Sequence, residues 1–211
     1  MNKVLLLDDR LERQKILMDD SELGELKKCE ENGWLTILSE LETSHEIIEA
    51  ELSQYSMIAI HRSWMDDHGV YNCIEEYVKR NKKFFVVFSG GISQNLLLNN
   101  RMRLNLNAAH FYTNKLPVLI KKYAREETNH PLLELLYGES WRLALLLEYR
   151  NLLWLGGSKY NFEKDFNSRE MLVNERIIEE PISMEKIEKA IEKEKYHYTL
   201  LCDNIGETVP S

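Results

Sequence analysis

The sequence is short of several features that commonly indicate a class of protein. Its three cysteines lie far apart and form no Cys-x-x-Cys pair, so neither a disulfide framework nor a zinc site is indicated, and we expect reduced thiols in a cytoplasmic protein. No stretch of about 18 uncharged apolar residues occurs, so we expect no membrane span. The apolar run over 4–7 is also too short for the core of a signal peptide.

Patterns that accompany phosphate chemistry, acyl transfer and nucleic-acid binding are missing as well. The chain contains no Gly-x-Gly-x-x-Gly or Walker pattern and no Gly-x-Ser-x-Gly elbow. No winged-helix or helix-turn-helix pattern follows the N-terminal part, and the net charge of -8 argues against broad binding to a phosphate backbone. We therefore expect no nucleic-acid partner.

What is present is the composition of an ordinary globular protein. Hydrophobic residues make up 44% and charged residues 29% of the 211 residues, which is enough apolar material to bury a core without disulfides. A chain of this length fits one domain with a substantial extension, or two small domains. We expect the first organisation, with a domain over 1–127 and an extension over 128–211.

The expected N-terminal domain alternates short apolar runs with helical patterns. The expected strands cover 3–7, 34–38, 57–60, 84–88 and 109–113. The expected helices cover 11–31 (with a break near Asp19), 43–52, 66–80, 94–100 and the segment that begins at Pro117. This alternation predicts an α/β fold, and right-handed connections favour a flavodoxin-like five-stranded parallel sheet with helices on both faces.

The extension is expected to be helical. Leucines together with Trp141, Tyr149 and Trp154 cover more than one face of a long apolar helix expected over about 131–155. Such a helix needs cover from the rest of the chain or from a partner. The part after residue 155 is polar, with a charged helix expected near 183–195 and a strand-like run over 196–202.

Chemically active side chains follow several of the expected strands. Asp8 and Asp9 follow the first strand and His61 the third, and at later strand ends lie Ser89 and Lys115. The carboxyl ends of parallel strands meet at one edge of a sheet, and ligands of such sheets bind at that edge. These five side chains are therefore the candidate site.

These segments, in this order, resemble the receiver domain of two-component response regulators over about residues 1–127. Asp8 and Asp9 match the paired acids that help to hold magnesium in that family. Ser89 matches the serine or threonine that senses the phosphoryl group. The resemblance implies a regulatory domain of flavodoxin-like fold.

The segment over 109–115 extends this resemblance. It is similar to the family's Ala-x-x-Tyr-x-x-Lys pattern, in which Tyr112 matches the aromatic switch position and Lys115 matches the lysine. Two details depart from the family. Leu116 separates Lys115 from Pro117, and the loop between the fourth-strand serine and Tyr112 is a few residues longer than usual.

The main departure is His61, which lies in the position of the phospho-accepting aspartate. A receiver needs a carboxylate nucleophile and a hard cation that neutralises the phosphoryl oxygens. Imidazole removes both the nucleophile and one oxygen ligand. The resemblance therefore implies a degenerate receiver that takes no phosphate from small phosphodonors, and we expect no metal and no other cofactor.

Three roles for His61 are open: a phosphate acceptor, a pH-responsive switch, or a histidine that fills the slot and hydrogen-bonds Asp8 or Asp9. We favour the last. We also expect Asp8 to form an ion pair with His61, which would raise the pKa of the histidine. For Ser89 and the two glycines after it, we favour a tight turn that uses positive φ over a cradle for an anion.

Our first hypothesis is a receiver-like regulatory or scaffold protein that is not an enzyme and that binds a protein partner or a second copy of itself. The expected contact face contains Tyr112 and, in the extension, Trp141, Tyr149 and Trp154. Receivers commonly use the corresponding face for their partners, and the apolar helix would extend it.

The alternative is an enzyme or a binder of phosphate or nucleotide that uses Asp8, His61 and Ser89. A nucleophilic role for Ser89 belongs to this alternative, although the missing Gly-x-Ser-x-Gly elbow argues against it. A third hypothesis, a transcription regulator, needs a DNA-binding element that the sequence does not show.

Overall fold

The computed structural model describes residues 1–10, 12–40, 45–68, 71–93, 95–98, 102–113, 115–154, 169 and 172–205. The chain divides into two compact units, Met1–Gly138 and Glu139–Ser211. The division therefore follows Gly138, whereas the sequence led us to expect it after residue 127. The first unit contains the sheet and the candidate site.

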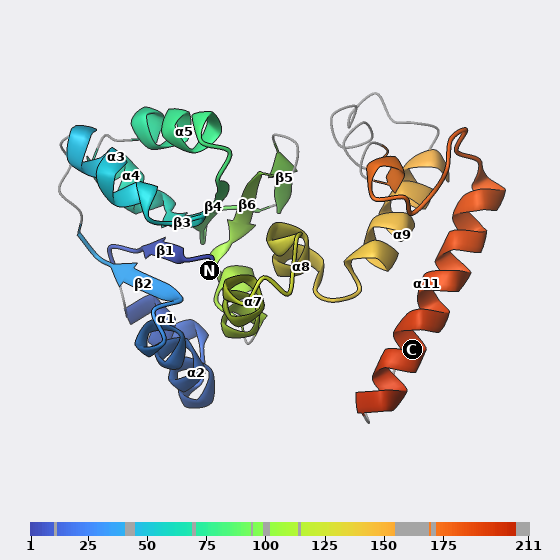
Figure 1. Ribbon diagram of the computed structural model, residues 1–211, viewed down its shortest axis with the longest axis horizontal. Coiled ribbons are helices and arrows are strands. Elements are labelled where there is room, and N and C mark those ends of the chain that lie inside the picture. Colours follow the sequence, from blue (N-terminus) through green and yellow to red (C-terminus); the bar gives the residue numbers. More distant parts are fainter. Residues whose placement is uncertain are drawn as a thin grey trace. The chain divides into compact units, whose positions relative to one another are not determined.

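The first unit is built on a six-stranded sheet (Figure 1). Its strands are β1 (Val4–Leu7), β2 (Leu35–Leu38), β3 (Met57–His61), β4 (Phe84–Ser89), β5 (Leu96–Leu98) and β6 (Arg103–Asn107). They lie in the order β2-β1-β3-β4-β6-β5, and every neighbouring pair is parallel except β5 with β6. The α/β class is confirmed, and this order is compatible with a flavodoxin-like arrangement. The expected count of five strands is wrong, because β5 adds a short antiparallel edge.

Helices cover both faces of the sheet (Figure 1). Those of the first unit are α1 (Glu12–Leu17), α2 (Asp20–Glu31), α3 (His45–Ser53), α4 (Arg62–His68), α5 (Tyr71–Arg80), α6 (Ala108–Phe111), α7 (Lys115–Ala124) and α8 (Pro131–Tyr137). Successive residues of a strand point to opposite faces. Val4 and Leu6 pack with α2, α6, α7 and α8, whereas Leu5 and Leu7 pack with α3, α4 and α5.

The expected break within the first helical segment is confirmed. α1 ends at Leu17 and α2 begins at Asp20. Asp19 caps α2 by accepting a hydrogen bond from the Glu22 backbone, and the Glu22 side chain accepts one from the Asp19 backbone. This reciprocal capping fixes the start of α2 and leaves α1 as a separate short helix directly after the two acids.

Two expectations over 94–113 are wrong. The segment expected as a helix over 94–100 contains strand β5, and of that segment 94, 99 and 100 lie outside the described residues. The segment expected as the fifth strand begins with helix α6, which Asn107 caps through the Ala109 backbone N–H. The fifth parallel strand is instead β6, in which Leu104 and Leu106 are buried between more polar neighbours.

The second unit is helical in the part that the structure describes. The single helix expected over 131–155 is wrong: α8 ends at Tyr137, Gly138 has φ 78°, and α9 runs over Trp141–Trp154. A positive φ cannot continue a helix, so Gly138 separates the two. The expected strand-like run over 196–202 is also wrong, because it belongs to α11 (Met184–Ile205). The expected polar segment over 155–168 lies outside the described residues.

Helices α9 and α11 pack against each other within this unit. The contact buries Leu145 and Tyr149 of α9 and Ile187 and Ile191 of α11, and Arg150 lies 3.7 Å from Glu188 across it. Among the described residues, no helix combines the length and the apolar character that crossing a membrane would require.

Candidate functional site

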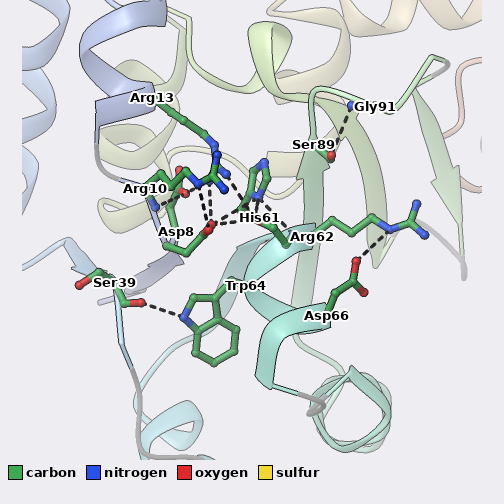
Figure 2. A network of polar contacts seen from close by, with 12 residues as sticks. Asp8, Arg10, Arg13, Ser39, His61, Arg62, Trp64, Asp66, Ser89 and Gly91 are labelled. Carbon is green, nitrogen blue, oxygen red and sulfur yellow. Dashed lines mark hydrogen bonds and ion pairs between the residues drawn. The ribbon is translucent and has the colours of Figure 1, made fainter.

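The candidate site lies at the carboxyl ends of β1 and β3, which are neighbours in the sheet (Figure 2). The parallel register pairs Leu7 with Ile60, so Asp8 and His61 are the next residues on each strand. The two strands therefore deliver the acidic pair and the imidazole to the same place, as the sequence predicted. The side-chain ligand atoms of Asp8, Asp9 and His61 all lie within 4.8 Å of one another.

Asp8 is fully buried, and its carboxylate is surrounded by donors. The backbone N–H of Arg10 donates to Oδ1 at 3.0 Å, and the Arg13 guanidinium donates to the same oxygen. The Tyr112 hydroxyl donates to Oδ2 at 2.6 Å. A buried carboxylate is tolerated only when its charge is paired and its lone pairs are hydrogen-bonded, and both conditions are met here.

Asp9 is more exposed and shares the same cation. Arg13 Nη1 and Ser63 Oγ each donate to Asp9 Oδ1 at 2.8 Å. Partial burial raises the pKa of Asp9, but the hydrogen bonds from Arg13 and Ser63, together with the Arg13 charge, outweigh it and lower that pKa to about 2. Asp9 is therefore ionised at any pH near neutrality.

Arg13 is the central cation of the site, and the sequence analysis missed it. It lies in the first turn of α1, four residues after Asp9, and its Nη1 atom contacts both acids. Its second terminal nitrogen donates to Ser63 Oγ at 3.3 Å. Burial lowers the pKa of Arg13, but the two carboxylates outweigh this and raise it. The signal that would have found it is an arginine at i+4 from an acid that precedes a helix.

His61 is the last residue of β3 and directly precedes α4, where its side chain caps the helix. Its Nδ1 atom accepts a hydrogen bond from the Ser63 backbone N–H at 3.2 Å and lies 2.6 Å from Ser63 Oγ. We had favoured a histidine that fills the slot and hydrogen-bonds Asp8 or Asp9; its hydrogen-bonding partner is instead Ser63, so the side chain serves as a helix cap.

The expected ion pair between Asp8 and His61 is not the contact that forms. His61 Nδ1 lies 3.6 Å from Asp9 Oδ1, with Ser63 beside both. The expected rise in the histidine's pKa is also wrong. Burial and the charge of Arg13 lower the pKa of His61, and they outweigh the two nearby carboxylates. The two acids lie where the sequence predicted, but the burial of the ring and the charge of Arg13 were not expected and outweigh their effect.

An aromatic cluster backs the site. The ring of Phe88 stacks on Phe111 with centroids 4.1 Å apart and meets His61 and Tyr112 edge-on, at 5.2 and 5.4 Å. Tyr112 is 1% exposed, and burial together with the Asp8 charge raises its pKa. Tyr112 therefore anchors Asp8 from the core. The expectation that it lies on a contact face is wrong.

Of the other residues expected on that face, two are buried as well. Trp141 and Tyr149 are 6% and 4% exposed, whereas Trp154 is 79% exposed. Aromatic residues at helical spacing serve the core here, as they commonly do. Trp154 alone of the four expected contact residues presents a large apolar surface.

Ser89 and Lys115 lie outside the network around Asp8. Ser89 Oγ accepts a hydrogen bond from the Gly91 backbone N–H at 3.3 Å, which agrees with the favoured turn (Figure 2). Gly90 and Gly91 do not have positive φ, so the expected reason for glycine in this turn is wrong. Lys115 is exposed at the start of α7. Its Nζ atom lies near Gly138, where an added Cβ atom would be 3.5 Å from it.

The resemblance to receivers implies a magnesium ion, so the fit of these residues to a divalent cation can be tested. Two carboxylates and an imidazole are suitable donor types. Their oxygens, however, are engaged by the guanidinium of Arg13 and by the hydroxyls of Ser63 and Tyr112. A cation beside Arg13 would meet a like charge, so this arrangement does not fit a bound metal.

Comparison with models of known protein families, with curated proteins and with solved structures finds no match for this chain.

Proposed function

We propose that the first unit is a degenerate receiver-like domain that acts by protein–protein contact, without phosphotransfer. The observation that carries this proposal is the pairing of Asp8 and Asp9 with Arg13 at the end of β1. In this arrangement the acids serve the stability of the fold and hold no ion for chemistry. The proposal places the protein in signal transduction in the cytoplasm.

Phosphotransfer needs a nucleophile at the end of β3, and His61 is a poor one. Its Nδ1 atom is engaged by Ser63, and the ring is buried, which limits the access of a phosphodonor. A phosphoryl group would also need a cation to neutralise its oxygens. Neither a nucleophilic carboxylate nor an accessible pair of acids is provided at this edge.

The sheet order and the positions of the two acids support the receiver-like assignment, while one motif match weighs against it. The Ala-x-x-Tyr-x-x-Lys match falls on α6 and the start of α7, not on a strand. Tyr112 nevertheless reaches the acidic pair from this segment, through its bond to Asp8. The segment before α7 is therefore still connected, through Tyr112, to the acids at the carboxyl end of β1.

Exposed apolar side chains supply candidate contact points for a partner. In the first unit Ile16 of α1 is 79% exposed and Val118 of α7 is 52% exposed. In the second unit Trp154 and Tyr196 are 79% and 65% exposed. The contact face expected from the sequence is mostly buried in the structure, so these exposed side chains are the better candidates for contact with a partner.

Two measurements test the proposal. Incubation of the wild type with acetyl phosphate should leave no stable label, and a stoichiometric label would contradict the absence of phosphotransfer. Size-exclusion chromatography with light scattering should show a dimer or a complex with a co-purified protein, which Ile16→Glu or Trp154→Glu weakens. Lys15→Glu, on an exposed position of the same helix as Ile16, is the matched control. A strictly monomeric protein without a partner would contradict the interaction role.

A second candidate function, binding of a phosphate or nucleotide, is favoured by the lowered pKa of His61. A neutral imidazole at the carboxyl edge of a parallel sheet is a suitable hydrogen-bonding group for a ligand. A thermal-shift screen against nucleotides and phosphosugars tests this function. A shift that His61→Ala abolishes would support it, and the absence of any shift would dismiss it.

A further inference from the structure

We propose that Arg13 takes the place of a divalent cation in the receiver-like site and closes that site to metal ions. The inference rests on the proposed function, because it identifies which charge pairs with the two acids that meet magnesium in receiver domains. It assigns to α1 a residue that supplies, from within the chain, a positive charge between the two acids.

The first argument is that all four carboxylate oxygens of Asp8 and Asp9 face a donor or a cation. Asp8 Oδ1 faces Arg13 and the Arg10 backbone, and Asp8 Oδ2 accepts from Tyr112. Asp9 Oδ1 accepts from Arg13 and Ser63, and Asp9 Oδ2 lies 3.6 Å from Arg10 Nε. A metal ion that took ligands from both acids would have to displace at least one of the groups bonded to Asp8.

The second argument is electrostatic. The Arg13 side chain is 18% exposed, and its Nη1 atom lies between a fully buried carboxylate and a largely buried one. At separations of a few ångströms and in surroundings less polar than water, like charges repel strongly. A cation could enter only if the guanidinium left, and the guanidinium would then lose both of its counter-charges.

The third argument is geometric and explains why arginine suits this position. The planar guanidinium uses Nη1 for the two acids and Nη2 for Ser63, so one side chain contacts three groups. A lysine ammonium would concentrate its charge at one atom and lacks this fork. The short helix α1, which starts directly after the acids, holds the fork in place.

Removal of the guanidinium should therefore uncover a latent metal site. The ligand atoms of Asp8, Asp9 and His61 lie within 4.8 Å of one another, which is close to the spacing that ligands adopt around one ion. Without Arg13, the arginine that still pairs with the two carboxylates among the described residues would be the exposed Arg10. Mn²⁺ is a suitable probe, because it accepts carboxylate oxygen and imidazole nitrogen.

The experiment is a Mn²⁺ titration of the full chain, followed by the electron paramagnetic resonance signal of the unbound ion. Wild type should show no saturable binding up to about 1 mM, the range of weak carboxylate sites. Arg13→Gln, which keeps a polar side chain and removes the charge, should bind one Mn²⁺ ion at least about tenfold more tightly than wild type does. Adding Asp8→Asn to that variant should abolish the gain. Arg62→Gln is the matched control and should behave as wild type, because Arg62 is exposed and pairs with Asp66.

Saturable binding by the wild type that Asp8→Asn removes would overturn the inference, and so would a folded Arg13→Gln protein that gains no Mn²⁺ affinity. If Arg13→Gln is unfolded, recovery of its circular dichroism on addition of Mn²⁺ supports the inference, and failure to recover contradicts it. Labelling of the wild type by acetyl phosphate would overturn the proposed function whatever the Mn²⁺ result. An unlabelled wild type and an Arg13→Gln protein without Mn²⁺ affinity would overturn this inference alone.

Discussion

The two ends of the parallel strands, here called the carboxyl edge and the amino edge of the sheet, hold their charged groups in opposite ways. At the carboxyl edge, Asp8 and Asp9 share another full charge, that of Arg13. At the amino edge, Lys83 Nζ donates to three backbone carbonyls at the end of α3, those of Leu52 (2.7 Å), Ser53 (3.1 Å) and Tyr55. The carbonyls are dipoles without net charge. Loss of a group at the carboxyl edge therefore leaves a buried charge unpaired, whereas loss of Lys83 leaves only neutral acceptors.

The amino edge also contains an open hollow. A hollow of about 330 Å³ lies there, lined by polar residues that include Lys3, Asn81 and Lys83. Water can reach carbonyls around such a hollow and can replace a lost donor. At the carboxyl edge Asp8 is fully buried, so water cannot replace a lost partner without a change of structure. Four predictions test this contrast.

The largest effect is expected for Asp8→Asn. Removal of this charge leaves Arg13 with one acid in place of two. The side-chain N–H group of the new asparagine would also face one of the donors, Arg13 or Tyr112, that Asp8 accepts from. Breaking a buried ion pair from one side costs about 3–5 kcal/mol in the free energy of unfolding. Urea denaturation followed by circular dichroism measures it. A loss below about 1 kcal/mol, typical of exposed pairs, would show that the network contributes little.

The second prediction compares one tyrosine from each edge. Tyr112→Phe leaves Asp8 Oδ2 without its hydroxyl donor in the core, which should cost about 2 kcal/mol. Tyr55→Phe removes a hydrogen bond to Glu51 in a more exposed setting, and it should cost under about 1 kcal/mol. Equal losses, measured by the same urea titration, would remove the distinction between the edges.

A smaller effect is expected for Lys83→Met. The substitution keeps the aliphatic length and removes the donor to three carbonyls, which should cost about 1 kcal/mol. Lys82→Met, at an exposed neighbouring position, is the control and should be within about 0.5 kcal/mol of wild type. A loss for Lys83→Met as large as that for Asp8→Asn would contradict the contrast.

The smallest effect is the dependence of stability on pH. The pKa of His61 is lowered in the folded state, so the unfolded chain binds more protons and stability falls as the pH drops below the ordinary histidine value of 6.5. The pKa of Asp9 is lowered from 3.8 to about 2, so its stabilising contribution is present above 3.8 and is lost as the pH falls toward 2.

His61→Asn is the variant that separates the two titrations, because asparagine also caps helices and does not titrate. Thermal melts of this variant should lose the decline in Tm between pH 6.5 and 5 and keep the decline below pH 4. A ring-proton titration of wild type by NMR should place the His61 midpoint below 6.5. A midpoint above that value would restore the ion pair expected from the sequence.

The parts of the fold that the sequence predicts are those fixed by local pattern. The apolar runs that became β1, β2, β3 and β4 are short, strongly apolar and bounded by polar residues, so their identity follows from pattern alone. Parallel pairing then brings the residues after β1 and β3 together, which is why Asp8, Asp9 and His61 could be placed at one edge. Neither step requires knowledge of side-chain packing.

The parts that the sequence does not predict depend on packing or on very short elements. Strand β5 has three leucines and no alternation, so its period gives no signal. The burial of Tyr112 and Trp141 depends on which face of a helix meets the core. The lowering of the His61 pKa depends on the burial of the ring and on the charge of Arg13, whose reach to both acids is set by the position of α1. Pattern rules contain no information on that position.

The most direct test of the central claim is an amide NMR spectrum of the ¹⁵N-labelled wild type with Mn²⁺ added in steps. Because Arg13 already occupies the place between Asp8 and Asp9, the amides of residues 8, 9 and 61 should keep their intensities relative to the rest of the first unit. Selective, saturable broadening of those three signals at low Mn²⁺ concentration would show that the acids hold a metal after all.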